Sequence, residues 1–366
     1  MELNPSQKQF ITNGIKDCIL NGPPGSGKTK TIKGFIEYNI EKGTLDKNSV
    51  LVFAFNNSSV ADIKKKCDFI NKKNISTFDT QVKLLMKYNK KTYENIPKKE
   101  EEKNIFFNKK LKICSNDIYE YNLDLYNSIN VIIIDEGQDM NKDNFNIVKV
   151  ISTKRKIPII IAGDINQSIY GFRGADAKLM QSHSKIVFSL DINYRSSQSI
   201  INFCDIFRTY NNDFKILSHD SRIGEKPKLY KYSMSKQSIF RYIIDKIISK
   251  YYNDDTKIAF LVNNNNILME FKNLLGEYKN VITQTICRSK GLEYDIVILF
   301  DFTDKSYFKD FDHVSDCNNW YVGASRAKEK LFIFHEEYST QYRRSRSLPE
   351  NMYGADNNLY ETIQLN

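Results

Sequence analysis

Residues 22–29 read Gly-Pro-Pro-Gly-Ser-Gly-Lys-Thr, a glycine-rich run that ends in a lysine and a hydroxyl side chain. The apolar run Cys18-Ile19-Leu20 before it is typical of the end of a buried strand, and residues 31–36 after it favour a helix. In that setting the glycines let the backbone wrap a phosphate, and the helix start directs N–H groups at it. The pattern predicts a phosphate-binding loop, with Lys28 neutralising the terminal phosphates and Thr29 holding Mg²⁺. An ordinary glycine-rich turn is the alternative, which the flanking strand and helix disfavour.

The length of 366 residues suits two domains better than one, and a hydrophobic content of 41% is sufficient for a sizeable core. Lys and Arg number 54 against 44 for Asp and Glu, which gives a net charge of +10. Such a surplus fits a polyanionic partner such as nucleic acid. A Lys-, Asn-, Ile- and Tyr-rich composition set by an AT-rich gene explains it equally well, because charge alone does not locate the lysines.

The cysteines are scattered and no two form a C-x-x-C pair, so the sequence predicts no zinc site and favours reduced thiols. The first residues lack the basic and apolar segments of a signal peptide. The longest apolar runs, such as 131–134 and 158–162, are too short to span a bilayer. We therefore expect no membrane partner and a cytoplasmic location, or the nucleus or a viral replication site if the source is a eukaryote or its virus.

Two carboxylates follow a run of four consecutive β-branched residues, Val131 to Ile134. Such a run predicts a strand buried on both faces, as in a parallel sheet, and α/β sheets bind ligands at the carboxyl ends of their strands. Asp135 is thus placed to hold Mg²⁺, and Glu136 to orient and deprotonate the water that attacks a γ-phosphate. Acidic residues after a strand also serve as helix N-caps, but the upstream phosphate loop favours the catalytic interpretation.

A loop with an amide, two aromatic rings and an arginine follows the apolar run 157–162. Gln167 is a candidate sensor of a γ-phosphate. Tyr170 and Phe172 are candidates for stacking on bases, and Arg173 for binding a backbone phosphate. The alternative is an ordinary strand-to-helix loop with buried aromatics. Upstream of the phosphate loop, Gln7 offers an amide that pairs bidentately with adenine, although a lone glutamine is more often a solvated helix residue.

With further segments, these runs resemble superfamily 1 helicases, and within them the UvrD/Rep/PcrA-like branch. The segments occur in family order from Leu3 to about Phe334, and the stretch from Gln167 to Ala175 is the most diagnostic. They are Leu3–Gln7 (Q motif), Gly22–Thr29 (motif I), Phe53–Asn57 (Ia), Thr77–Asp79 (Ib), Ile134–Asp139 (II), Gly163–Ala175 (III), Asn193–Ser196 (IV), Thr285–Asp295 (V) and Tyr321–Ala327 (VI).

The resemblance implies an α/β fold of two RecA-like P-loop NTPase lobes, each a mainly parallel sheet flanked by helices, with ATP in the cleft between them. The first lobe would span 1–185, with a small helical insertion at about 86–128, and the second 186–337. Residues 338–366 would form a polar tail, either disordered or a weak polyanion contact through Arg343 to Arg346. Second-lobe strands are expected at 228–232, 258–262, 296–300 and 331–334, and residues 276–285 are expected to be a short connection.

The resemblance also assigns roles in the second lobe. Arg195 and Arg326 would act as arginine fingers that reach the γ-phosphate when the lobes close. Tyr194 would stack on adenine, and Glu293 would meet the ribose. The full set of expected ATP contacts adds Gln7, Gly22, Pro23, Pro24, Gly25, Ser26, Gly27, Lys28, Thr29 and Lys30, and the expected single-stranded DNA contacts are Phe55, Asn57, Tyr170, Phe172 and Arg173.

The sequence departs from the family pattern in several places. The first insertion is short and the large second-lobe insertion is absent, which makes this a minimal, two-lobe form. Asp79 and Cys287 stand where the family usually has His, Lys30 where it has Arg, and an Arg expected near Asn263 is missing. These changes leave the expected ATP site nearly complete, and those at Asp79 and Cys287 fall at family positions towards the DNA side.

The leading interpretation is a monomeric ATP-dependent DNA helicase or single-stranded DNA translocase of 3′-to-5′ polarity. It would hydrolyse Mg²⁺-ATP and act in DNA repair or replication. A nucleic-acid-stimulated ATPase that displaces proteins or acts on RNA is the alternative, and it predicts turnover without strand separation. A non-enzymatic adaptor is a third possibility. The intact set Lys28, Asp135, Glu136, Gln167, Arg195 and Arg326 argues against the adaptor.

Overall fold

The computed structural model describes residues 3–210, 214–263, 265–275, 278, 280–300, 313–336 and 358–365. The chain divides into two compact units, one made of Met1–Pro23 and Gly27–Leu190 and the other of Pro24–Ser26 and Asp191–Asn366. The division after Leu190, rather than near Lys185, follows from strand pairing. The short strand β6 (Val187–Ser189) pairs with β1 (Cys18–Asn21) and so belongs to the first sheet.

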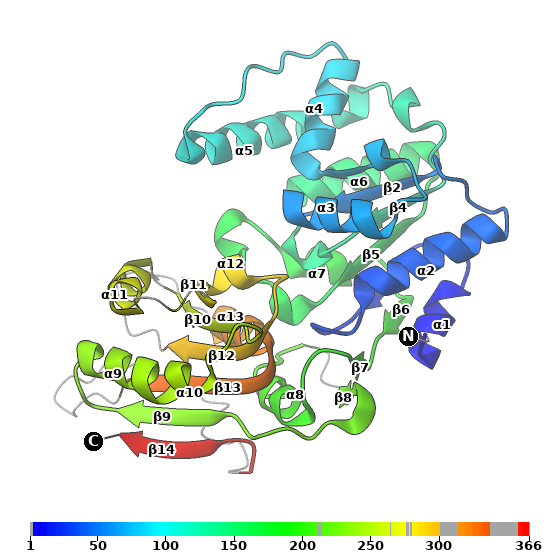
Figure 1. The fold of residues 1–366 in the computed structure, drawn as a ribbon. Helices are drawn as coiled ribbons and strands as arrows, with labels where there is room; N and C mark the ends of the chain where they lie inside the picture. Colours follow the sequence, from blue (N-terminus) through cyan, green and yellow to red (C-terminus); the bar gives the residue numbers. More distant parts are fainter. Residues whose placement is uncertain are drawn as a thin grey trace. The chain divides into compact units, whose positions relative to one another are not determined.

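The first unit is built on six parallel strands in the order β3-β2-β4-β5-β1-β6 (Figure 1). Besides β1 and β6, these are β2 (Val50–Ala54), β3 (Ile75–Thr77), β4 (Val131–Ile134) and β5 (Ile159–Gly163). The helices outside the insertion are α1 (Pro5–Ile11), α2 (Lys28–Glu41), α3 (Asn57–Lys66), α4 (Phe78–Tyr88), α6 (Lys142–Arg155) and α7 (Ala177–Gln181).

Both faces of this sheet are covered. Val131 and Ile133 join one hydrophobic core with apolar side chains of α1, α2 and α3. Ile132 and Ile134 point to the opposite face because side chains alternate along a strand, and they too are fully buried. The run of β-branched residues therefore forms a strand inside a parallel sheet with helices on both sides, as the sequence predicted.

The insertion at about 86–128 contains one long helix, α5 (Glu100–Asp117), and two short 3₁₀ turns, Ile118–Glu120 and Asp124–Tyr126. α5 packs against α4 and α6 (Figure 1). Lys110 of α5 has a buried side chain that pairs with Glu94, and its ammonium group lies over the rings of Tyr93 and Phe106. The helix is thus held by the loop that precedes it.

The second unit also has a sheet of six parallel strands, in the order β11-β10-β12-β13-β9-β14. These are β9 (Lys228–Tyr232), β10 (Ile258–Val262), β11 (Val281–Thr285), β12 (Tyr294–Phe300), β13 (Ala327–Glu336) and β14 (Glu361–Leu365). A two-stranded ribbon, β7 (Ile192–Asn193) with β8 (Leu217–Ser218), lies outside it. The two parallel sheets confirm the α/β, RecA-like fold predicted from the sequence.

The helical segments of the second unit are α8 (Gln198–Asp205), α9 (Lys236–Tyr242), a π-helical turn (Ile243–Ile248), α10 (Ser249–Tyr251), α11 (Asn265–Leu275), α12 (Ile286–Ser289) and α13 (His313–Ala324). Aromatic rings fill much of the core. Phe260 of β10 stacks on Phe271 of α11 at a centroid distance of 3.7 Å, and Phe240 of α9 packs edge-on against both.

Two expectations for the second unit were wrong. Residues 276–285 are not merely a connection, because Val281–Thr285 form β11 and pair with β10 along their whole length. The segment 338–366 is not only a polar tail, because Glu361–Leu365 form β14 at the edge of the sheet beside β9. Tyr360, just before β14, packs edge-on against Phe203 of α8. The basic run from Arg343 to Arg346 lies outside the described residues.

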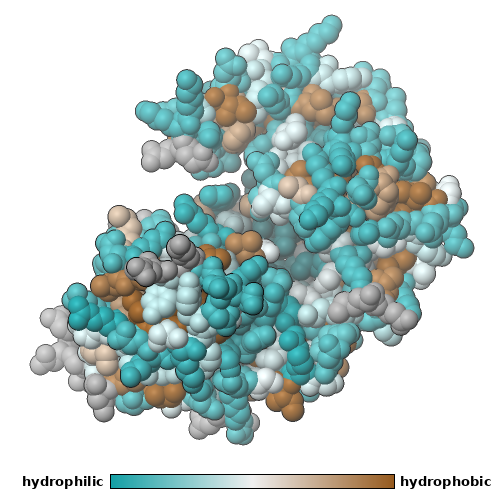
Figure 2. Space-filling model, in the orientation of Figure 1, coloured by the Kyte–Doolittle hydropathy of each residue, from teal (hydrophilic) through white to brown (hydrophobic). Residues whose placement is uncertain are grey.

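Hydrophilic side chains cover most of the face of each unit that Figure 2 shows. Among the described residues, no helix combines the length and the apolar character that a bilayer crossing requires.

Candidate functional site

The glycine-rich loop lies between β1 and α2, as its sequence predicted. Gly25 and Gly27 have φ angles of +77° and +81°, a region that other residues enter at a cost. A side chain on Gly27 would also place its Cβ 3.1 Å from Nε2 of Gln7. Lys28 is buried, and its Nζ donates to the carbonyl oxygen of Gly22 at 2.8 Å. The lysine thus folds back over the loop, the position from which it would meet a phosphate held there.

The other predicted loop residues lie where the motif requires. Pro23, Pro24 and Ser26 are buried in the loop itself, whereas Thr29 and Lys30 are half-buried in the first turn of α2. Thr29 therefore lies in the first turn of α2, directly after the loop that would cradle a phosphate.

Gln7 is fully buried, so its reading as a solvated helix residue was wrong. It sits in α1, whose N-cap is Asn4. The backbone N–H of Gln7 donates to Oδ1 of Asn4 at 2.8 Å, and the N–H of Asn4 donates to Oε1 of Gln7 at 3.1 Å. This capping box fixes the amide and leaves its Nε2 on the side of Gly27. A buried amide held beside the phosphate loop is suited to reading the base of a nucleotide.

Asp135 and Glu136 follow β4 at the carboxyl end of the sheet. Asp135 is buried, and one of its oxygens accepts from the N–H of Glu136 at 3.1 Å. Burial, together with the neighbouring carboxylate of Glu136, raises the pKa of Asp135, and the charge of Lys28 partly opposes this. Oxygen donors from Asp135 and Thr29 suit Mg²⁺, whose charge would offset the cost of burying this carboxylate.

Glu136 has a left-handed backbone, with φ 56° and ψ 44°, which costs a residue with a side chain about 1–2 kcal/mol. The following 3₁₀ turn, Gly137–Asp139, fixes this conformation. Gly137 packs so closely that a Cβ there would lie 2.2 Å from Cγ2 of Ile161 in β5. The strained backbone therefore sets the direction in which the glutamate leaves the strand.

A chain of hydrogen bonds joins Glu136 to the loop after β5. Nε2 of Gln138 donates to Oε2 of Glu136 at 2.5 Å, and Oε1 of Gln138 accepts from the N–H of Asp164 at 3.0 Å. Nε2 of Gln167 donates to the carboxylate of Asp164 at 3.0 Å. The predicted base and the predicted phosphate sensor thus belong to one buried network.

Four of the five predicted DNA contacts gather at the surface of the first unit. Tyr170 stacks on Phe55 at a centroid distance of 5.1 Å and lies 6.0 Å from Phe172. The guanidinium of Arg173 lies over both Tyr170 and Phe172, at 5.5 and 5.6 Å. Phe172 is 69% exposed, so the alternative of buried aromatics was wrong for this ring. Asn57, the fifth, is exposed at the start of α3.

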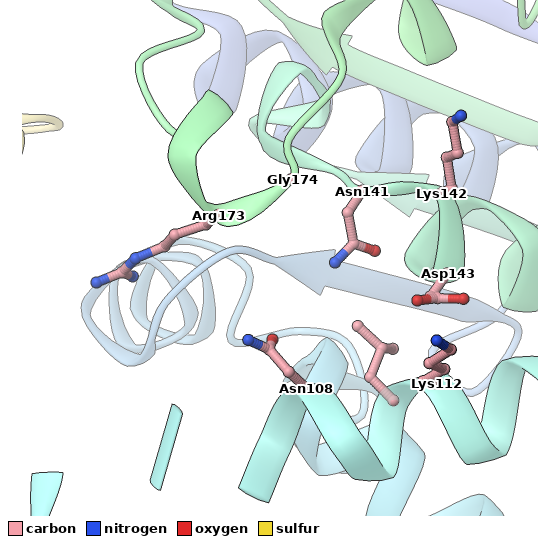
Figure 3. A pocket seen from close by; sticks show the side chains of 8 residues that line it. Asn108, Lys112, Asn141, Lys142, Asp143, Arg173 and Gly174 are labelled. Carbon is pink, nitrogen blue, oxygen red and sulfur yellow. The ribbon is translucent and has the colours of Figure 1, made fainter. Parts of the chain in front are cut away.

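A cavity of about 330 Å³ lies beside this cluster. Asn108 and Lys112 line it from α5, and Asn141, Lys142 and Asp143 line it from the start of α6 (Figure 3). Arg173 and Gly174 line its third side, and the Arg173 side chain extends away from Asp143 in Figure 3. Three cationic side chains against one carboxylate give this part of the surface a charge suited to a phosphate backbone.

The predicted second-unit residues also form a cluster. Glu293 accepts from Nε of Arg195 at 2.9 Å and pairs with Nζ of Lys328 at 2.9 Å. Burial raises the pKa of Glu293, but the hydrogen bond from Lys328 and the charge of Arg195 outweigh it, and the pKa lies below its usual range. Nη1 of Arg195 also donates to the carbonyl oxygen of Ser325, at 3.2 Å.

Arg326 has its guanidinium buried within the second unit. Its Nε donates to the carbonyl of Val322 at 2.9 Å, Nη1 to that of Leu292 at 3.3 Å, and Nη2 to Oγ of Ser325 at 3.0 Å. Tyr194 lies against the ring of His219 at a centroid distance of 4.6 Å. The roles of Arg326 as a finger and of Tyr194 as an adenine platform stay predictions.

Sequence reasoning missed two members of the first-unit network, Gln138 and Asp164. Both lie inside the segments that carry the family resemblance. Gln138 follows the predicted catalytic carboxylates, and Asp164 begins the loop 164–173 that holds Gln167, called the sensor loop below. Their position in those segments was the sequence signal that could have identified them. Their partners depend on the register of β4 beside β5, which the sequence does not specify.

Two family models match the chain. The one described as an AAA domain matches residues 7–173, and the one described as a UvrD-like helicase C-terminal domain matches residues 281–334. A protein of Acanthamoeba polyphaga mimivirus, whose name marks it as a candidate ATP-dependent DNA helicase, is 27% identical over 91% of this chain and 53% of its own length. ATP-dependent DNA helicase PcrA of Staphylococcus epidermidis is 32% identical over 33% of this chain and 17% of its own.

The glycine-rich loop between β1 and α2 and the two parallel sheets place the chain in the class of P-loop proteins with two RecA-like sheets. Through these matches, which lie in both units, the chain is similar to the UvrD/PcrA-like helicases of superfamily 1. It spans about half, or less, of the length of the relatives named above.

Proposed function

We propose that this chain is an ATP-dependent DNA helicase or single-stranded DNA translocase that moves 3′ to 5′. The observation that carries the proposal is the arrangement in the first lobe. A buried hydrogen-bond network links Glu136 to Gln167, and the loop that holds Gln167 continues into the exposed ring cluster of Tyr170 and Phe172. The proposed phosphate sensor and the proposed stacking rings thus share the loop 164–173, and hydrogen bonds join that loop to Glu136.

The first lobe would bind and hydrolyse ATP. Lys28 would neutralise the β- and γ-phosphates, and Thr29 and Asp135 would hold Mg²⁺. The metal ion, when bound, supplies charge neutralisation at the phosphates. Glu136 would orient the attacking water and take its proton, and Gln167 would sense the γ-phosphate. Gln7 would select adenine through its held amide.

The second lobe would complete the site in the closed state. Arg195 and Arg326 would contact the γ-phosphate, which requires each guanidinium to exchange its present partners for phosphate oxygens. Tyr194 would stack on adenine and Glu293 would meet the ribose. Hydrolysis removes the γ-phosphate and with it the contacts of Arg195 and Arg326 that would hold the lobes closed. The lobes would therefore reopen once per cycle.

Single-stranded DNA would bind the first lobe through Phe55, Asn57, Tyr170, Phe172 and Arg173. Ring stacking is tolerant of base sequence, and the cationic side chains attract the backbone, so this surface suits a strand of any sequence. The relatives named as DNA helicases support DNA as the partner. We further propose that one copy suffices, which light scattering of the active species would test.

Steady-state ATP hydrolysis tests the proposal, measured alone, with single-stranded DNA and with single-stranded RNA. We expect strong stimulation by DNA and no turnover in a Lys28→Ala control, and tailed duplexes then test the polarity. Stimulation by RNA alone, or by DNA without any strand separation, would favour the protein-displacing or RNA-directed ATPase instead. No hydrolysis under any of these conditions would contradict an enzymatic role for the chain as it stands.

A further inference from the structure

The side-chain amide of Gln138 has a determined orientation. Its Oε1 receives the backbone N–H of Asp164 at 3.0 Å, so its Nε2 is the atom that faces Oε2 of Glu136 at 2.5 Å. Turning the amide over would place an oxygen against the carboxylate and an N–H against an N–H, and both contacts repel. Gln138 therefore donates to the proposed base.

The side chain of Gln138 is closely packed. The side chain is fully buried, and a Cβ on Gly163 would lie 2.3 Å from Oε1 of Gln138. Its backbone carbonyl also accepts from the hydroxyl of Ser168, at 3.3 Å. The absence of a side chain at Gly163 is thus what admits the amide between β4 and β5.

Gln138 contacts the sensor loop at two points, through its side chain and through its backbone carbonyl. The first contact is with Asp164, whose carboxylate accepts from the backbone N–H of Asn166 at 3.1 Å and from Nε2 of Gln167 at 3.0 Å. The second is with Ser168, two residues before the ring of Tyr170 that stacks on Phe55. A displacement of this loop must therefore move the hydrogen-bond donor of Glu136.

We propose that Gln138 is a positioning residue, which holds the carboxylate of Glu136 and makes its placement depend on the loop that carries the ring cluster. Binding of a strand to Tyr170 and Phe172 would shift the loop, and Gln138 would transmit that shift to the base. The inference rests on the proposed function, because it assigns to Gln138 the link between strand binding and hydrolysis. Gln138 is outside the sets of residues proposed to contact ATP and the strand.

Two variants separate this role from a role in folding. Gln138→Glu keeps the shape and the acceptor for the N–H of Asp164, but replaces the donor to Glu136 by an acidic oxygen. Gln138→Leu removes both bonds. Gln81→Leu is the matched control, because Gln81 is also a buried amide of the first unit, bonded to Ser76 and to the hydroxyl of Tyr126 at 2.9 and 3.1 Å.

Turnover with and without single-stranded DNA is the measurement, together with the KM for ATP and the Kd for a fluorescent oligonucleotide. In both Gln138 variants we expect kcat with DNA to fall at least about tenfold, because misplacing a catalytic group by 1 Å costs on the order of 100-fold. Turnover without DNA should fall less, so the stimulation ratio falls. The KM and the Kd should stay within about twofold, since Gln138 is not among the residues proposed to contact either ligand.

A stimulation ratio equal to that of the wild type in both Gln138 variants would overturn the inference, as would an equal loss in Gln81→Leu. Failure of the proposed function looks different, because it appears in the wild type as ATP hydrolysis that DNA does not stimulate. If DNA does not stimulate the wild type, the kcat for ATP hydrolysis without DNA tests the positioning role. An unchanged kcat in both Gln138 variants would then refute it.

Discussion

Replacing Phe172 by alanine tests the strand-binding surface most directly. The ring is 69% exposed and sits on the 3₁₀ turn Gly171–Arg173, with Tyr170 and the guanidinium of Arg173 as neighbours. Because little of the ring is buried, its loss should change the free energy of unfolding by no more than about 0.5 kcal/mol. An effect on nucleic-acid binding can then be read without a folding defect.

The size of the expected effect follows from stacking. Removing an aromatic platform costs about 1–3 kcal/mol per stacked base, which is a loss of about 5- to 150-fold in affinity. Fluorescence anisotropy with a labelled oligothymidylate would measure the Kd, and a titration of ATPase activity with the same strand would measure the half-saturating concentration. Both should rise by the same factor, and DNA-stimulated turnover should suffer more than turnover without DNA.

Ile105→Ala is the matched control, because Ile105 is 71% exposed on α5 and has no predicted contact with the strand. It should leave the Kd unchanged. If Phe172→Ala lowered turnover with and without DNA equally, or left the Kd at the wild-type value, the ring would be structural and the assignment of the strand surface would be refuted.

Three further results are expected. Glu136→Gln should lower kcat about 10²- to 10⁴-fold while ATP still binds, and retained hydrolysis would refute its role as the base. Gly137→Ala should destabilise the first unit by about 1–3 kcal/mol, because its Cβ would lie 2.2 Å from Cγ2 of Ile161, whereas Gly171→Ala, with nothing within 4 Å of its Cβ position, should leave the melting temperature unchanged. Burial lowers the pKa of His183 below its ordinary value of 6.5, so its contribution to stability is complete above pH 6.5 and is lost as the pH falls below it. The melting temperature should therefore fall less with acidification in His183→Gln than in the wild type, and equal slopes would contradict this.

The sequence was most informative where one local pattern dictates both structure and chemistry. The β-branched run from Val131 to Ile134 predicted a doubly covered strand, and the glycines before Lys28 predicted a loop between strand and helix. In both cases the neighbouring residues alone determine the conformation. The two-lobe fold class came from the family resemblance that these and the other segments carry, and the two parallel sheets confirm it.

Other features depend on partners distant in sequence, and the sequence did not reveal them. β6, β11 and β14 are only three to five residues long and carry partly exposed side chains, so no long buried apolar run marks them as strands. The contact of Gln138 with Asp164 depends on how β4 lies beside β5. Side-chain pairings of this kind are set by tertiary packing rather than by local pattern.

The position of β14 has a consequence for how the chain is made. Its residues pair with β9 from Lys228 opposite Glu361 to Tyr232 opposite Leu365. During translation β9 therefore leaves the ribosome long before β14 has been synthesised. Until then, the backbone N–H and C=O groups on the β14 side of β9 have no strand to pair with. Open strand edges recruit strands of other chains. Nascent chains stalled before residue 358 should accordingly be the most prone to aggregate and the most dependent on chaperones.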